Sequence, residues 1–158
     1  MARAREVEGL SGSEAFRSAA ARVVAVRADE LFEHAAGVLD VEDIELVHDM
    51  RVATRRLRAV LEIFAACFPP KAHRRVLRDV KRLADALGER RDPDVQIAAL
   101  EDFAAHATAA DRPGVEALVS RLRDEQAGAN ASLAEALVAV ERSDLRGRLA
   151  ALVEAVGR

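Results

Sequence analysis

The stretch HDMRVATRRLRAVLEIFAACF, residues 48–68, decides the fold, because its apolar residues recur every three or four positions. That period is the period of an α-helix with one buried face. The residues expected on this face, which span about 100° of a helical wheel, are Met50, Ala53, Leu57, Val60, Leu61, Phe64 and Phe68. Because Pro69 and Pro70 cannot continue a helix, the pattern predicts a helix from about Val41 to Phe68.

The rest of the chain repeats this pattern, which predicts an all-α fold and a helical bundle of about six helices. The aromatic content is only 3%, with no Trp or Tyr, so the core must consist of Ala, Leu and Val, which favours helices over sheets. The other expected helices run from Ser13 to Ala36, from Lys71 to Leu87, from Pro93 to a break at Asp111–Gly114, from there to about Val140, and onward from a Ser143 cap.

Caps and breakers set most of these boundaries. Ser13 is the expected N-cap of the first helix, and Gly37 its stop. Gly88 is expected to end the third helix, and Asp92 with Pro93 to cap and begin the fourth. Phe16, on the first helix, and Phe103, on the fourth, are expected on buried faces, and Phe64, Phe68 and Phe103 leave no exposed platform for stacking bases.

The chain divides into residues 1–12, a flexible lead-in without periodicity, and residues 13–158, one helical domain. Its single cysteine, Cys67, excludes an intramolecular disulfide and is expected to be a buried thiol. No apolar run approaches membrane-spanning length, and arginines interrupt the Ala/Val-rich stretch near the start, which excludes a signal peptide core. We therefore expect a cytoplasmic protein.

The charge is segregated along the chain. Residues 48–91 contain twelve Lys and Arg against five Asp and Glu, whereas the remainder contains twelve basic and 22 acidic residues. The formal net charge of −3 therefore hides a strongly basic segment. Because local field strength depends on nearby charges, this segment can bind an anion.

Most of these basic residues lie in two rows. His48, Arg51, Arg55 and Arg58 are spaced by three or four residues and form a stripe opposite the apolar face of the second helix. The third helix has a second row with two flanking arginines, which consists of Arg74, Arg78 and Lys81 with Arg75 and Arg82. If the two helices are antiparallel neighbours, we expect the rows side by side. Like charges at this spacing destabilise a helix, and a bound polyanion would offset this repulsion. The alternative interpretation is that each charge is simply exposed to solvent and binds no ligand.

Two motifs in this region resemble the CHAD domain, the conserved histidine α-helical domain: HDMRVATRRLR at residues 48–58 and LADALGERRDPDV at residues 83–95. The resemblance covers about Ser13 to Leu100. It implies an all-helical fold that binds inorganic polyphosphate on a basic surface or pore. The ligand-facing residues that it implies are His48, Arg51, Arg55, Arg56 and Arg58 from the first motif, with Lys81, Arg82, Arg90 and Arg91 from the second. Arg74 and Arg78 join them from the row on the third helix.

Members of this family usually contain two such halves, and only the first resembles this sequence. Either the chain is a half-domain that pairs with itself as a homodimer, or the sequence is one half of a longer domain. We expect non-catalytic polyphosphate binding, with a targeting role at polyphosphate granules. The alternatives are nonspecific nucleic-acid binding, a polyanion-bridging scaffold and an enzyme acting on polyphosphate. No cofactor or metal is expected, since Asp102 and His106 are an isolated pair.

Overall fold

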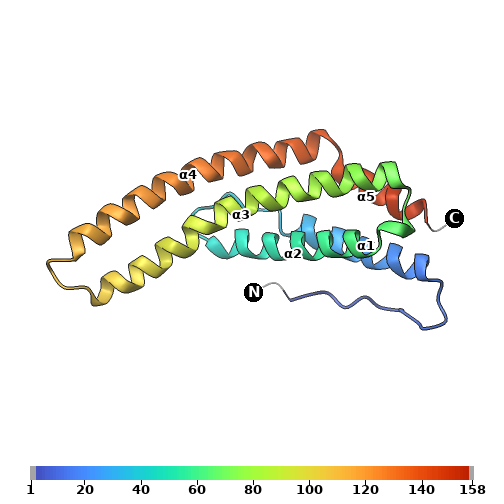
Figure 1. Cartoon of the computed structure of the whole chain (residues 1–158), viewed down its shortest axis with the longest axis horizontal. Coiled ribbons are helices and arrows are strands. Elements are labelled where there is room, and N and C mark those ends of the chain that lie inside the picture. The colour runs from blue at the N-terminus through green and yellow to red at the C-terminus, as the bar shows by residue number, and fades with distance from the viewer. Residues whose placement is uncertain (1–2, 157–158) are drawn as a thin grey trace.

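The computed structural model describes residues 3–156, which form an all-helical bundle (Figure 1). Residues 1–2 and 157–158, assigned above to the lead-in and to the helical domain, lie outside the described residues. The elements are α1 (Phe16–Glu33), α2 (Ile44–Ile63), the short 3-10 helix η1 (Ala65–Cys67), α3 (Pro70–His106), α4 (Arg112–Arg142) and α5 (Leu145–Glu154). The expected all-α fold is confirmed, and the described part of the chain contains no strand.

The helices pack as successive antiparallel neighbours. α2 lies between α1 and α3, α3 packs along α4, and α5 returns against α1 and α3. Their apolar faces enclose one core in which Leu31, Leu57, Leu61, Leu83 and Leu87 are at most 1% exposed. Cys67 is buried in this core as a free thiol, as expected.

The third and fourth expected helices are one continuous helix, α3, so the predicted stop at Gly88 and the predicted cap at Asp92 are wrong. Pro93 lies inside this helix, where it removes a backbone donor, and α3 bends in its middle (Figure 1). The helix continues because Asp94, one position beyond the proline, pairs with Arg90 one turn earlier and accepts a hydrogen bond from Gln126 of α4. Contacts with α4 thus keep α3 helical despite the proline at position 93.

Other helix ends differ by a few residues from the expected ones. α1 begins at Phe16, after Ala15, so Ser13 is not its cap. Gly37 has a φ of 73°, a left-handed conformation suited to glycine in the turn after α1. Asp144, rather than Ser143, is the N-cap of α5, and its carboxylate accepts a hydrogen bond from the Gly147 N–H at 3.1 Å.

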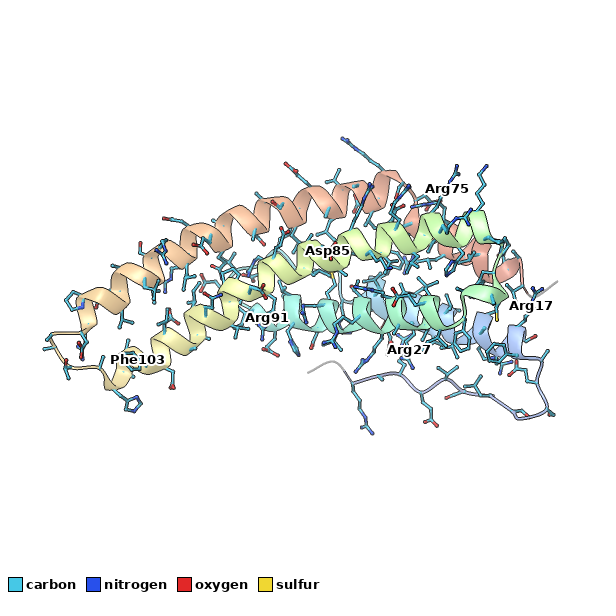
Figure 2. The ribbon with its side chains drawn as sticks, in the orientation of Figure 1. Arg17, Arg27, Arg75, Asp85, Arg91 and Phe103 are labelled. Atoms are coloured by element: carbon cyan, nitrogen blue, oxygen red, sulfur yellow. The ribbon has the colours of Figure 1, made fainter. Side chains whose placement is uncertain are left out.

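The end of α3 and the start of α4 project beyond the other helices as a two-helix arm, which carries Phe103 (Figures 1 and 2). Phe103 is 57% exposed on this arm, so its predicted burial is wrong: only two helices are present there to cover apolar side chains. Phe16 is also exposed, at 66%, and contacts the ring of Phe64 edge-on at a centroid distance of 5.4 Å. None of the helices in residues 3–156 combines the length and apolar character needed to cross a membrane.

Residues 3–12 form no helix or strand and lie along α1. The guanidinium of Arg22 donates to the Gly9 carbonyl at 2.6 Å, and that of Arg27 donates to the Arg5 carbonyl at 2.8 Å. Glu30, which is 3% exposed, accepts from the backbone N–H of Arg5 and from Arg27. Burial opposes ionisation of Glu30, but the hydrogen bonds from Arg27 and Arg5 and the charges of Arg27 and Arg56 outweigh it and lower its pKa.

Candidate anion-binding surface

The basic stripe of α2 lies opposite the buried face of that helix, as predicted. Met50, Leu57 and Leu61 are buried, whereas Arg55 is exposed and Arg51 is half-buried. His48 and Arg58 are also half-buried. A shallow hollow of 460 Å³ follows one flank of the stripe and is lined by Val52, Arg55, Arg56, Arg58, Ala59 and Glu62. α2 thus offers its donors to solvent while its other side fills the core.

One carboxylate joins the rows of α2 and α3. Glu62 accepts a hydrogen bond from Arg58 Nε at 3.2 Å, and Lys81 Nζ of α3 lies 2.9 Å from the same oxygen. Hydrogen bonding from Lys81, and then from Arg58, lowers the pKa of Glu62, with the charges of both cations acting in the same direction. Two cations share one carboxylate here, so the junction keeps a net positive charge.

The rows meet end to end and not side by side, which corrects the expected arrangement. In the antiparallel pair, Lys81 is level with Glu62, and Arg91 Nη1 donates to the carbonyl of Ile44 at 3.0 Å at the other end of α2. Arg51 and Arg55 therefore lie opposite the segment of α3 around Asp85 and Glu89, beyond the row of that helix. Because α2 and α3 run in opposite directions, the row of α3 at residues 74–81 lies next to the turn that joins the helices. The row of α2 at residues 48–58 lies farther from this turn, so the two rows meet only near Glu62.

The result is one extended line of cations, which we call the basic track. It consists of Arg51, Arg55 and Arg58 on α2 and Lys81, Arg78 and Arg74 on α3, with Glu62 at the junction. Each half spans eight residues of helix, which is about 10 Å of helix length. Within residues 3–156, Arg51, Arg55 and Arg74 have neither an ion-pair partner nor a side-chain hydrogen bond, so their donors face solvent. The track suits an elongated anion.

Arg90 lies outside this surface, although the sequence motif placed it in the ligand set. It is 0% exposed, pairs with Asp94 and donates from Nε to Asn130 Oδ1 of α4 at 3.0 Å. Asp94 also accepts from Gln126 Nε2 at 2.6 Å, and Asn130 Nδ2 donates to the Leu39 carbonyl at 3.0 Å. Arg90 therefore joins α3 to α4 and cannot reach a surface ligand in this structure.

Arg91 and Arg56 lie at the margins of the track. Arg91 donates to the Ile44 carbonyl, and its Nη2 lies 3.7 Å from Glu45 Oε1, so it holds the start of α2 against α3 (Figure 2). Arg56 is half-buried on the flank of α2 that faces α1, where its charge helps to lower the pKa of Glu30. Of the four basic residues assigned to the second motif, Lys81 and Arg82, which directly precede it, remain accessible.

His48 lies one turn before Arg51, beside two acidic residues. Glu45, His48 and Asp49 each place one ligand atom within 4.8 Å of the others, so this group could hold a metal ion, which the sequence analysis did not consider. Asp102 and His106 were the only pair that the sequence suggested as metal ligands. In the structure, the ring Nδ1 of His106 lies 3.2 Å from the backbone oxygen of Asp102, so this contact does not involve the Asp102 carboxylate.

Arg148 of α5 also belongs to this basic region, although no sequence pattern predicted it. Arg148 Nη2 lies 2.7 Å from Asp79 Oδ2, and Arg78 and Arg82 approach the other oxygen of the same carboxylate. Arg148 is separated from Asp79 by 69 residues, and no spacing rule within one helix relates them. Only the return of α5 against α3 brings this arginine to the basic region of α3.

Comparison with protein-family models matches residues 22–157 to the CHAD domain. The match extends through α4 and α5, so it is not confined to the segment up to Leu100 on which the motif resemblance rests, nor to an N-terminal half. A search of curated proteins found no significant match to the chain.

Proposed function

The chain belongs to the CHAD domain family, and from this premise we propose that it binds inorganic polyphosphate along the basic track without catalysing a reaction. The observation that carries the proposal is the junction at Glu62, where Arg58 and Lys81 bring the rows of two helices into one line. A linear polyanion has a charge at every repeat and can contact the whole line. A compact anion would reach only part of it.

The chemistry of the track fits phosphate. Three of the five arginines in the track are exposed, and a guanidinium donates two parallel hydrogen bonds to phosphate oxygens. Arginine is also less strongly hydrated than lysine, so less free energy is lost when the ligand displaces water. Binding of this kind releases counterions and should weaken steeply as salt rises.

Nucleic acid is the main competing ligand. Single-stranded nucleic acids are commonly bound by exposed aromatic rings that stack on bases. Phe103 is exposed, contrary to expectation, but it lies 22 residues along α3 from Lys81, which is roughly 30 Å of helix. A polyanion lying along the track would not contact Phe103, which favours a ligand without bases.

We further propose a targeting role in the cytoplasm at polyphosphate granules, and pairing of two copies in which both tracks contact one ligand. Pairing would double the local positive charge, and an isologous interface requires only one kind of surface. The mass of the particle in solution, measured with and without long-chain polyphosphate, tests the pairing: a mass equal to one chain in both conditions would contradict it.

The binding proposal is tested by titrating the protein with long-chain polyphosphate, tripolyphosphate, duplex DNA and single-stranded DNA at two salt concentrations. We expect the long-chain polyphosphate to bind tightest and to lose affinity steeply with salt. The double substitution R51E/R55E should abolish most of this binding without loss of helicity, because both side chains point away from the core. Equal affinity for all four ligands, or unchanged binding by R51E/R55E, would contradict the proposal.

A further inference from the structure

A second group of basic side chains lies on the flank of α3 that faces away from α2. Residues 75, 78, 79 and 82 follow helical spacing on this flank, and Figure 2 shows Arg75 pointing away from α2. α5 adds Arg148. We call this group the Asp79 patch: Arg75, Arg78, Arg82 and Arg148 around the carboxylate of Asp79.

One of these arginines has a structural role. Arg148 Nη2 lies 2.7 Å from Asp79 Oδ2 and 2.8 Å from Ser143 Oγ, and its Nε donates to the Ser143 carbonyl at 2.8 Å. This set of contacts joins the start of α5 to α3. The Asp79 side chain is only 16% exposed, so its negative charge lies beneath the guanidinium groups and is already neutralised by Arg148.

The other arginines are not needed for that connection. Arg78 Nε lies 3.6 Å from Asp79 Oδ1 and Arg82 Nη1 lies 3.9 Å from it, distances too long for hydrogen bonds. Their side chains are 60% and 73% exposed, and within residues 3–156 neither donates a hydrogen bond to protein. Arg75 is exposed as well. Three arginines thus approach one carboxylate and Arg75 lies on the same flank of α3, while Arg75, Arg78 and Arg82 are exposed.

We infer that the Asp79 patch is a second phosphate-binding site, which takes an oligophosphate and continues the basic track across α3. Arg78 belongs to both groups, so a chain bound on the track can turn at Arg78 and reach α5. The crossing covers about one helix diameter, roughly 10–12 Å. The inference deepens the proposed function and rests on it, because it assigns the same class of ligand to a second surface.

The test uses tripolyphosphate, which is short enough to occupy one surface at a time. With two of the α2 cations of the track reversed by R51E/R55E, calorimetry should still detect saturable tripolyphosphate binding. Adding R75E/R82E should lower this residual affinity by roughly tenfold or more, as expected for lost charge-assisted contacts. Both residues are exposed on α3, and Arg148 is left intact so that α5 keeps its contact.

The matched control is R112E/R121E, which makes the same change in net charge at exposed positions on the arm. It should leave the residual binding close to that of the R51E/R55E parent. Absence of residual binding in R51E/R55E, or equal losses from R75E/R82E and from the control, would overturn the second site while leaving the track intact. Failure of the wild-type chain to bind polyphosphate would instead remove the proposed function.

Discussion

The substitution E62Q should strengthen polyphosphate binding, because Glu62 is the one acidic side chain at the junction of the basic track. Its carboxylate accepts from Arg58 at 3.2 Å and lies 2.9 Å from Lys81 Nζ. A ligand that uses these two cations must compete with Glu62 and also approaches its negative charge. Glutamine keeps the size and an acceptor oxygen but removes both the charge and the competition.

The size of the gain follows from the exposure of the three side chains. Arg58, Lys81 and Glu62 are 43%, 41% and 41% exposed, so each ion pair is a surface pair of about 0.2–1 kcal/mol. Releasing both pairs should contribute about 1 kcal/mol to binding, roughly a fivefold rise in affinity for long-chain polyphosphate. Because E62Q removes the same two pairs from the folded protein, the cost to folding should also be about 1 kcal/mol.

Calorimetric titration at low and moderate salt measures the gain, and E125Q is the matched control. Glu125 is likewise exposed and lies four residues after its partner, with Arg121 Nε 3.9 Å from its carboxylate, but this pair is on α4 away from the track. E125Q changes the net charge by the same amount and should leave affinity close to the wild-type value. Chemical denaturation of both variants measures the change in folding free energy.

The pH dependence gives a second readout of the same group. The pKa of Glu62 is lowered by its two cations, so wild-type affinity should rise as the pH falls below 4.5 through this pKa, whereas E62Q should lack this rise. The stability that Glu62 contributes has the opposite dependence: it is present above pH 4.5 and is lost as the carboxylate is protonated. Unchanged or weaker binding by E62Q would contradict the prediction, and weaker binding would mean that Glu62 positions Arg58 and Lys81 for the ligand.

Three further predictions concern the fold that supports the track. D94A leaves the fully buried Arg90 without its carboxylate and should destabilise the protein by about 3–5 kcal/mol in urea denaturation; a loss below 1 kcal/mol would contradict the pairing. E30Q should flatten the fall in stability as the pH drops below 4.5, because the lowered pKa of Glu30 makes its ionised form stabilising above pH 4.5. P93A restores a backbone donor inside α3 and should raise the Tm by a few degrees; a lower Tm would show that packing of the buried proline ring outweighs the hydrogen bond.

The helical class and the buried faces of the individual helices follow from local sequence alone. In α2, the apolar positions and the row from His48 to Arg58 alternate with the helical period, and this period fixes which side is buried whatever the neighbours are. The buried Met50 and Leu57 and the exposed Arg55 follow directly. The motifs that indicate the family are also local sequence features, and the match over residues 22–157 confirms the family.

How these faces combine depends on contacts between helices. The rows of α2 and α3 were expected side by side, but the register of the two helices places them end to end, with Glu62 at the junction. Packing against Gln126 and Asn130 carried α3 through Pro93 and took Arg90 out of the predicted ligand set, because a buried guanidinium must find its partners within the protein. The return of α5 brought Arg148 to Asp79. Each of these outcomes depends on contacts between residues far apart in sequence, which a periodicity of three to four residues does not specify.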